Sequence, residues 1–302
     1  MTKNHICVCL CTFKRLDLLK KCLGELAYQN TDGLFSYSVV VVDNDSSRSA
    51  EGVVQSFQRT SDIEFSYYVE PEQNIALARN RAAENARGDF IAILDDDEYP
   101  EKEWLLKLYT ACIKYESDGV LGPVKAYFGE GRPDWVVKGK LCEKPSPPTG
   151  TVVHPGDTRT SNVLIKREIF DEPDNRFDPS FGRTGGSDVR FFVKVIGKGH
   201  VFVWCREAVV YEVITPERWT VSYYLRRALR QGGLSGTEMK KKEVSHRRFL
   251  RVIAAFSVYT IMTPFALLFG KHNCIKYLIK STYQLAWLSA YCGHIFIRLR
   301  DD

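Results

Sequence analysis

The sequence predicts an α/β fold of the Rossmann-like kind, with a mostly parallel central sheet flanked by helices and a helical tail after it. Between residue 5 and about residue 127, apolar runs of strand length alternate with segments of helical period. Such alternation is typical of parallel strands whose crossovers are helices. Hydrophobic residues make up 44% of the 302 residues, which is enough for a core and excludes a disordered chain.

The expected elements follow one another in strand and helix order. They are a strand over 6–11, a helix over 16–28, a strand over 38–42, a helix over 50–57, a strand over 64–69, a helix containing 76–86, a strand over 90–94, a helix over 101–115 and a strand over 120–127. A loop rich in Pro and Gly follows over 129–157, and a second α/β stretch covers 161–211. Because ligands of such sheets bind beyond the carboxyl ends of the strands, the residues after Cys11, Val42 and Leu94 are the first candidates for a site.

Charge and cysteine content narrow the class of protein and its compartment. The formal net charge is +5, from 42 Lys and Arg against 37 Asp and Glu, which is too small for a general polyanion binder. No nucleic-acid-binding signature is present, so we expect no nucleic acid partner. Nine cysteines without zinc-finger spacing predict a reducing compartment, and the polar residues 1–5 lack a signal-peptide core, so we expect a cytoplasmic location. Cys7, Cys9 and Cys11 alternate along one strand, and we interpret them as buried small hydrophobic residues.

The tail, residues 223–302, differs in kind from the expected catalytic domain over 1–222. Between 223 and 251 the sequence has two acidic residues, Glu238 and Glu243, against the following basic ones: Arg226, Arg227, Arg230, Lys240, Lys241, Lys242, Arg247, Arg248 and Arg251. Uncharged runs then cover 252–270 and 281–297. Spanning a bilayer takes about 20 apolar residues, so we predict two helices lying in the membrane interface, anchored by the cationic stretch at 226–251. The alternative is a soluble helical subdomain or a dimer interface.

A run of carboxylates, Asp95, Asp96, Asp97 and Glu98, ends the apolar strand over 90–94. Adjacent carboxylates in low-dielectric surroundings repel one another and raise one another's pKa unless a cation compensates. Oxygen ligands at a strand end suit Mg²⁺ or Mn²⁺, which takes one or two carboxylates and fills its other positions with phosphate oxygens and water. The run therefore indicates a divalent metal site, with a solvated acidic loop as the alternative.

Polar residues follow two further strands at the same expected edge of the sheet. Thr12 and Arg15 come after the first strand, and Asp43 and Asp45 come after the second. An Asp in this place can accept a hydrogen bond from a base N–H, and Arg15 supplies positive charge. Asp and Ser after a strand are also ordinary helix caps, so this motif alone leaves both interpretations open.

The segment over 73–80 begins a helix that carries Asn74 and Arg79. An arginine on such a helix can contact a phosphate or stabilise the acidic run. This segment adds a third group of polar residues to the same expected site.

Taken together and in order, these segments resemble the family 2 glycosyltransferases of the GT-A fold, over roughly residues 5–215. The matching segments are 11–15, 42–46, 74–80, 94–97 with Pro100 and Trp104, and 185–188. Within the family, the chain is most similar to the glucosyltransferases that extend the lipid-linked succinoglycan repeat unit. The features shared with those are 120–124, Tyr127, Trp135, Asn162, Phe177, Asp178, the segment 184–186, and Glu212 before Pro216 and Glu217.

The resemblance implies a role for each matching residue. Family members hold uracil with the residues that match Thr12 and the region of Asp43 and Asp45, and they contact the ribose with the residue that matches Asp96. The metal that bridges the diphosphate is bound by Asp97, and Glu212 falls where many relatives place a metal-contacting residue. The implied nucleotide-sugar site consists of Thr12, Phe13, Arg15, Asp43, Asp45, Asn74, Arg79, Asp95 and Asp96.

The family's catalytic base is the second acidic residue of a Gly-Gly-Glu-Asp motif, which falls here on Asp188. The sequence departs from that motif at Ser187, where Glu is usual. A carboxylate in this place takes the proton of a sugar hydroxyl as it attacks the anomeric carbon, and attack opposite the leaving group inverts the configuration. The alternative for Asp188 is a helix-start carboxylate after a Gly-Gly turn.

The resemblance implies transfer of a sugar from UDP-glucose or another UDP-hexose to a hydroxyl of a lipid-linked oligosaccharide, in exopolysaccharide or surface glycan assembly. Two other classes are alternatives. A non-catalytic nucleotide-sugar-binding protein would be favoured by loss of Asp97 or Asp188, and both are present. A nucleotidyltransferase would be expected to carry a glycine-rich phosphate loop after the first strand, and the segment 11–15 has no glycine.

Overall fold

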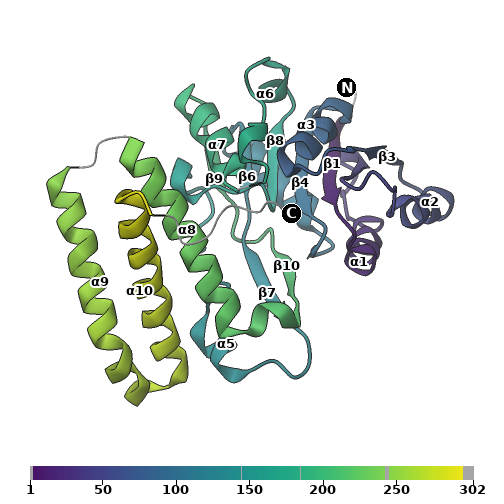
Figure 1. Cartoon of the computed structure of the whole chain (residues 1–302). Helices are drawn as coiled ribbons and strands as arrows, with labels where there is room; N and C mark the ends of the chain where they lie inside the picture. The colour runs from purple at the N-terminus through teal and green to yellow at the C-terminus, as the bar shows by residue number, and fades with distance from the viewer. Residues whose placement is uncertain (1–2, 144, 184, 242–244, 295–302) are drawn as a thin grey trace. The chain divides into compact units, whose positions relative to one another are not determined.

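The computed structural model describes residues 3–294 apart from 144, 184 and 242–244. The chain forms two compact units (Figure 1). The first consists of residues 1–127 and 144–213, and the second of residues 128–143 and 214–302. Lys242, Glu243, Thr184 and the end of the apolar run over 281–297 lie outside the described residues.

The first unit is built on a seven-stranded sheet in the order β3-β2-β1-β4-β8-β6-β9. Its strands are β1 (Asn4–Thr12), β2 (Phe35–Asp43), β3 (Phe65–Val69), β4 (Phe90–Asp95), β6 (Gly119–Leu121), β8 (Val163–Lys166) and β9 (Phe202–Trp204). The strands β3, β2, β1 and β4 are parallel, as are β6 and β9, whereas β8 is antiparallel to both of its neighbours. The predicted α/β fold with a mostly parallel sheet is confirmed.

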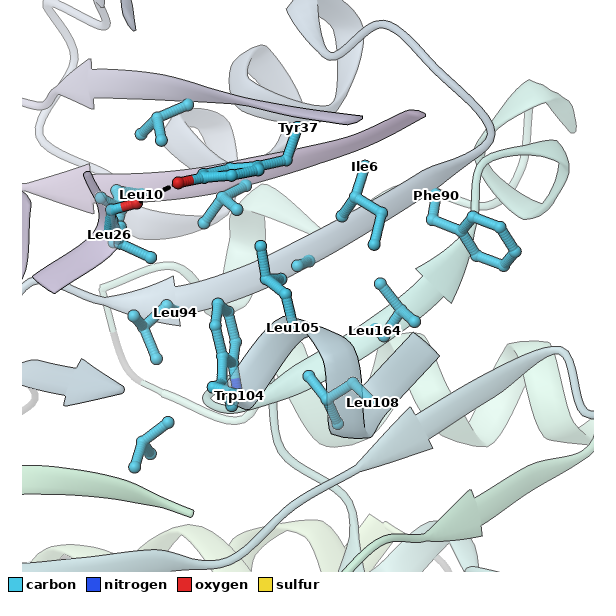
Figure 2. Packing of buried hydrophobic residues seen from close by; sticks show 14 of the residues in the cluster. Ile6, Leu10, Leu26, Tyr37, Phe90, Leu94, Trp104, Leu105, Leu108 and Leu164 are labelled. Atoms are coloured by element: carbon cyan, nitrogen blue, oxygen red, sulfur yellow. Dashed lines mark hydrogen bonds between the residues drawn. The ribbon is translucent and has the colours of Figure 1, made fainter. Parts of the chain in front are cut away.

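Helices cover both faces of this sheet. They are α1 (Leu16–Leu26), α2 (Glu51–Thr60), α3 (Ile75–Asn85), α4 (Trp104–Lys114), α6 (Glu168–Asp171) and α7 (Ser187–Gly197), with short 3₁₀ turns at η1 (Pro155–Asp157) and η2 (Pro179–Phe181). One core layer contains Ile6 and Leu10 of β1 together with Trp104 and Leu105 of α4 (Figure 2). Cys7 and Cys9 point into the other layer, which α3 and α7 help to form.

Side chains along β1 point alternately to the two faces of the sheet, which explains why its three cysteines share one face. Cys7 and Cys9 are buried in the second core layer, and Cys11 packs against that layer. Burial raises the pKa of the Cys11 thiol to about 12, so it is an unreactive thiol at neutral pH. The prediction that these three residues act as small hydrophobic side chains is confirmed, and all nine cysteines of the chain are free thiols.

The single strand predicted over 120–127 is wrong, because the chain divides there between two sheets. Gly119–Leu121 belongs to the large sheet, and β7 (Val124–Phe128) joins β10 (Val210–Ile214) and β5 (Glu98–Pro100) in a small sheet of order β5-β10-β7. A Cβ atom at Gly122 would collide with the Ala208 carbonyl oxygen, so the chain changes sheets at a position that only glycine fills. The loop expected over 129–157 also contains the short helix α5 (Asp134–Gly139) and η1.

Asn162 is the buried hub that holds the two sheets together. The side chain is fully buried and its φ is +54°, a left-handed conformation that Asn tolerates better than most residues. Its Oδ1 accepts a hydrogen bond from Trp104 Nε1 at 2.7 Å, and its Nδ2 donates to the carbonyl oxygens of Pro123 at 2.8 Å and Ala208 at 2.7 Å. Because β7 and β10 begin just after Pro123 and Ala208, Asn162 fixes where both strands of the small sheet start.

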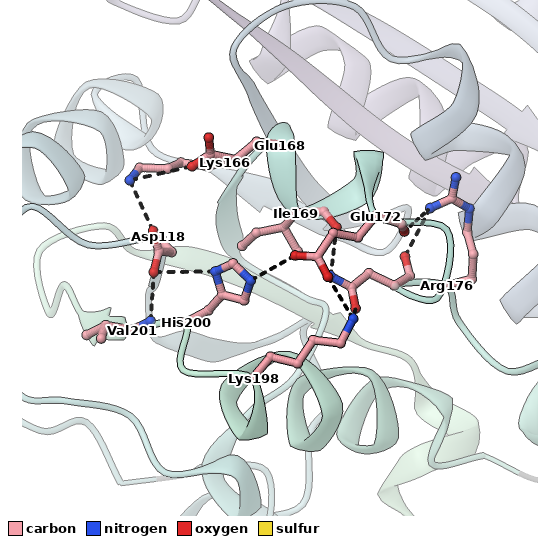
Figure 3. A network of polar contacts seen from close by, with 10 residues as sticks. Asp118, Lys166, Glu168, Ile169, Glu172, Arg176, Lys198, His200 and Val201 are labelled. Atoms are coloured by element: carbon pink, nitrogen blue, oxygen red, sulfur yellow. Dashed lines mark hydrogen bonds and ion pairs between the residues drawn. The ribbon is translucent and has the colours of Figure 1, made fainter.

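A polar network holds β6, β8 and β9 together (Figure 3). The Asp118 carboxylate accepts from Lys166 Nζ at 3.0 Å and from the backbone N–H of Val201 at 2.9 Å. His200 lies between Asp118 and Glu172, with ring nitrogens 3.5 Å and 3.3 Å from their carboxylate oxygens. The network therefore joins the ends of three neighbouring strands whose residues are far apart in the sequence.

The second unit contains three long helices, α8 (Val221–Lys241), α9 (His246–Ala266) and α10 (Lys271–Tyr291), with η3 (Pro216–Trp219) before them and η4 (Leu267–Phe269) between the last two. The helix α10 packs against both α8 and α9 (Figure 1). Gly232 and Gly236 allow the close approach of α8, because a Cβ at either would collide with a carbonyl oxygen of α10. A helix is present at each of the two apolar runs, but with other bounds: α9 ends at Ala266, and α10 begins at Lys271, ten residues before the expected run, and ends at Tyr291.

Among the described residues, one helical segment is long and apolar enough to cross a membrane by length and composition. It covers His246–Phe269, with a mean hydropathy of 2.0 in its most apolar window, of which 6% is buried. The core helix of a soluble protein would be mostly buried, so this segment has an unusually exposed apolar face.

We predict that Asn162→Ala lowers the free energy of unfolding by about 3 kcal/mol, because it leaves the buried Trp104 indole N–H without an acceptor and strains a left-handed backbone. Urea unfolding measures the change. Asn30→Ala is the matched control, because Asn30 is exposed and its Oδ1 accepts from the nearby backbone N–H of Asp32, so we expect a loss of about 1 kcal/mol or less. Equal stability of the two variants would contradict the role of Asn162 as a hub.

Candidate active site

The carboxyl ends of β1 and β4 bring four of the predicted site residues into direct contact. Thr12 Oγ1 donates to Asp96 Oδ2 at 2.7 Å, and Arg15 Nη1 lies 3.1 Å from both Asp96 Oδ1 and Asp97 Oδ2. In register, Thr12 pairs with Asp43 of β2. The parallel sheet therefore places polar residues from three strands at one edge, as the sequence indicates. Phe13, the next residue along, is partly exposed at this edge.

The acidic run is joined by Glu212, which comes from a distant part of the sequence. In the antiparallel pairing of β5 with β10, Glu212 is the register partner of Glu98. The backbone N–H of Val213 donates to the Asp97 carbonyl oxygen at 2.8 Å. Asp95, on the outer side, is 3.4 Å from Arg79 Nη2 of α3. The acidic run therefore forms one cluster with two other predicted site residues, Glu212 and Arg79.

Burial dominates the electrostatics of this cluster. Burial, helped by the charge of Asp95 and opposed by Arg15, raises the pKa of Asp97 to about 7. Burial also raises the pKa of Asp96, against the favourable charge of Arg15. The fully buried Glu98 has its pKa raised well above the usual range by burial and by its carboxylate neighbours. Burial therefore disfavours the ionised carboxylates of this cluster, and an added cation would stabilise them.

The oxygen donors of this cluster fit a magnesium or manganese ion bound through few protein ligands. Within the described part of the chain, no group of three or more His, Cys, Asp or Glu side chains is arranged to hold a metal ion. Mg²⁺ and Mn²⁺ are commonly held by one or two carboxylates, with phosphate oxygens and water at the other positions. Burial is the main cause of the raised pKa of Asp97, and a bound cation would favour the ionised form of this carboxyl group.

Asp43 and Asp45 organise the loop after β2. The fully buried Asp43 accepts hydrogen bonds from the backbone N–H groups of Asp45 at 3.1 Å and Ala50 at 2.8 Å, and from Tyr67 Oη at 2.9 Å. Asp45 accepts from Ser47 Oγ at 2.6 Å, which lowers its pKa. These carboxylates therefore act as loop and helix-start acceptors, and a contact of either with a nucleobase stays a prediction.

Asn74 connects this edge to the loop before Asp188. Its Oδ1 accepts from the backbone N–H of Ala76 and so caps α3, and its Nδ2 donates to the Pro179 carbonyl oxygen at 2.9 Å. Arg183 Nε donates to the Gln73 carbonyl oxygen at 3.2 Å. These bonds hold Pro179 and Arg183 against the start of α3.

Asp188 is half-buried in the first turn of α7. It follows Gly185 and Gly186, whose φ angles of +89° and +95° require glycine. Ser187 stands where the family usually has Glu. Its side chain is small and buried.

Sequence reasoning did not include Asn44 among the site residues, although the structure gives it a central position. Its Oδ1 accepts from the backbone N–H of Asn74 at 2.9 Å, and its backbone N–H donates to the Thr12 carbonyl oxygen at 2.8 Å. Asn44 therefore links the Asn74 cap to the Thr12 end of β1. The sequence did hold one indication of this role, because Asn44 lies between two predicted site residues, Asp43 and Asp45.

Comparison with known proteins agrees with this geometry. Residues 7–177 match the model of glycosyl transferase family 2. The chain is 32% identical over 241 residues to the succinoglycan biosynthesis protein ExoM of Rhizobium meliloti, covering 79% of this chain and 76% of that protein. This chain is therefore an enzyme of the glycosyltransferase class and belongs to glycosyl transferase family 2.

Solved structures show the same fold. The mannosyltransferase PcManGT from Pyrobaculum calidifontis, solved with GDP-Man and Mn²⁺, superposes with a TM-score of 0.60 at 18% identity, covering 98% of this chain and 88% of that one. S. aureus TarS 1-349 with UDP-GlcNAc gives 0.55 at 16% identity, covering 100% and 97%. The fold is the GT-A fold, and the expected resemblance is confirmed.

The raised pKa of Asp97 predicts a pH dependence of stability in metal-free buffer. A carboxyl protonated more readily in the folded state stabilises the fold fully at low pH, and this contribution is lost as the pH rises from about 4 to about 7. Asp97→Asn has no such group, so its stability relative to the native protein should increase over that window and level off above about pH 7. Urea unfolding at several pH values with a chelator tests this, with Asp62→Asn as the control for loss of an exposed carboxylate.

Proposed function

We propose that this enzyme is a metal-dependent, inverting hexosyltransferase. It moves a sugar from a UDP-sugar, UDP-glucose or another UDP-hexose, to a hydroxyl of a lipid-linked oligosaccharide during exopolysaccharide or surface glycan assembly. The observation that carries the proposal is the cluster of Thr12, Arg15, Asp96 and Asp97 at the sheet edge that Asn74 connects to the Asp188 loop. The relation to a succinoglycan biosynthesis protein and the likeness to a UDP-GlcNAc complex support the substrate class.

The nucleotide-sugar would be bound at the carboxyl edge of β1, β2 and β4. Thr12 and the loop that Asp43 orders, with Asp45 in it, would hold uracil, and Asp96 would contact the ribose. The other members of the proposed donor site are Phe13, Arg15, Asn74, Arg79 and Asp95. A fixed loop suits this task, because a site ordered before the donor arrives loses less entropy on binding.

A bound Mg²⁺ or Mn²⁺ would be held by Asp97, with Glu212 beside it, and would stabilise the negative charge that develops on the departing diphosphate. Arg15 and Arg79 already face the acidic run, from 3.1 Å and 3.4 Å, and add fixed positive charge at the same edge. Fixed cations of this kind stabilise a leaving group most in a site that excludes water.

Asp188 is the proposed catalytic base. A sugar hydroxyl is a weak nucleophile, so a carboxylate within hydrogen-bond reach must take its proton as the oxygen attacks the anomeric carbon. The new glycosidic bond forms as the bond from that carbon to the diphosphate oxygen breaks, on the opposite face of the sugar. An α-linked donor then gives a β-linked product, and no covalent enzyme intermediate forms.

The proposed location is the cytoplasmic face of the membrane. The nine free cysteines suit a reducing compartment, and the exposed apolar face of α9 suits contact with a lipid surface. The basic residues on α8 and at the start of α9 would add attraction to anionic lipids. Residues 1–222 would carry catalysis and residues 223–302 the membrane contact.

We predict that Asp188→Asn lowers the rate of sugar transfer by about 10³-fold while UDP-sugar affinity stays within about threefold, because only proton removal is lost. Product formation from radiolabelled UDP-glucose and calorimetric donor binding measure the two effects. Asp174→Asn, an exposed residue before the same helix, is the control. Normal turnover by Asp188→Asn would reject the assignment of the base.

We predict that Asp97→Ala removes the increase in donor affinity that Mn²⁺ or Mg²⁺ produces, because it deletes the carboxylate proposed to hold the ion. Calorimetric titration of UDP with and without Mn²⁺ checks this prediction. Asp62→Ala, at an exposed position away from the site, controls for loss of charge. If Mn²⁺ still increased donor affinity in Asp97→Ala, the assignment of the metal to Asp97 would be wrong.

A further inference from the structure

The second unit contains a cavity of about 570 Å³ that no step of the proposed transfer uses. Three arginines from the first turns of α9 line it, Arg247, Arg248 and Arg251, together with Gln284 of α10. We call it the arginine cavity. No carboxylate lines it among the described residues, so its positive charge faces the open space.

The lining of the arginine cavity changes from charged to apolar along α9. After the three arginines come Val252 and Ala255, which complete that side of the wall. A lipid has the same order of chemistry, with a phosphate headgroup followed by glyceride and acyl chain. A free anion would use only the charged end of such a cavity.

The surface of α9 and η4 beyond the cavity is also apolar. Ile261, Phe265, Leu268 and Phe269 are exposed by 62%, 54%, 83% and 75%, and the sequence has no charged residue between Arg251 and Lys271. If this face lies in the acyl region of a bilayer, the start of α9 lies at the level of the headgroup phosphates.

The start of α9 adds a further attraction for an anion. Its N-cap residue, Ser245, lines the cavity and makes no side-chain capping hydrogen bond. The first-turn N–H groups of a helix carry partial positive charge and bind phosphate oxygens well. The three arginines and the N-terminal end of α9 therefore lie at the same part of the arginine cavity.

We propose that the arginine cavity binds the phosphate of an anionic bilayer phospholipid. The phosphate lies among Arg247, Arg248 and Arg251, and the glyceride and first acyl carbons lie along Val252 and Ala255. This inference rests on the membrane contact in the proposed function and deepens it, because it makes attachment depend on a particular lipid headgroup.

The test is sedimentation of the full chain with three kinds of vesicle, and with a fourth kind that carries farnesyl diphosphate as the competing ligand. The first three are phosphatidylcholine alone, phosphatidylcholine with phosphatidylglycerol, and phosphatidylcholine with cholesteryl hemisuccinate at matched surface charge. The hemisuccinate carries a carboxylate and no phosphate, so it separates phosphate recognition from charge. We expect the tightest binding to the phosphatidylglycerol vesicles.

Two double variants with equal loss of charge locate the effect. Arg248→Gln with Arg251→Gln removes cavity arginines, and Arg226→Gln with Arg230→Gln removes exposed arginines of α8 outside the cavity. We expect the first pair to weaken binding to phosphatidylglycerol vesicles about tenfold or more and the second pair by less than about threefold. Circular dichroism confirms that both variants are folded.

Several outcomes would overturn the inference. Equal loss in both double variants would assign binding to diffuse charge, and equal binding to phosphatidylglycerol and hemisuccinate vesicles would remove phosphate recognition. Tighter binding to vesicles that carry farnesyl diphosphate would assign the cavity to a lipid diphosphate. Failure of the native protein to bind any vesicle would end the membrane proposal as well, whereas transfer activity in the same preparation tests the glycosyltransferase assignment separately.

Discussion

The burial of several carboxylates at one edge of the sheet is the constraint on which the rest of the site depends. Four consecutive acidic residues, 95–98, run from the last residue of β4 to the first of β5, and the small sheet adds Glu212 beside Glu98. Arg15 and Arg79 approach this cluster at its outer side, yet the pKa of Asp97 is still raised to about 7. A fold does not gather carboxylates in this way for stability, since burying each one costs free energy. The cost is understandable when a cation and a diphosphate complete the site.

The large sheet could be predicted because its signal is local. Each of β1, β2 and β4 is an uninterrupted apolar run, and the polar residues directly after the strands mark the edge where a ligand binds. The break between β6 and β7 does have a local signal, the Gly122-Pro123 dipeptide, which is typical of a turn and which the prediction of one strand over 120–127 did not use. The causes of the break, Asn162 and Ala208, lie some forty residues and more away in the sequence. The strand β5, three residues long, is too short for any periodic signal.

The sequence predicted which residues belong to the candidate site better than it predicted what each of them does. Resemblance selects Asp43, but its three donors, which include Ala50 and Tyr67, are known only from the folded chain. The same holds for the Asn74 side chain, which bonds a carbonyl group 105 residues later. The sequence shows that such residues are polar and follow strands. Long-range hydrogen bonding decides which of them face a ligand and which hold the loops that do.

If the second unit contacts a membrane as proposed, its helices fit a position on the membrane better than one across it. In an antiparallel hairpin that spans a bilayer, Lys276 and Lys280 of α10 would lie roughly 8 Å and 14 Å along the helix from its start. A lysine near the bilayer centre costs about 3 kcal/mol, and Pro264 would weaken the partner helix α9. If α9 instead lies in the interface, its apolar face enters the acyl region while the cations of α10 stay at headgroup level. The tight packing of Gly232 and Gly236 against α10 then serves to keep α8 and α10 together while the outer face of α9 remains exposed.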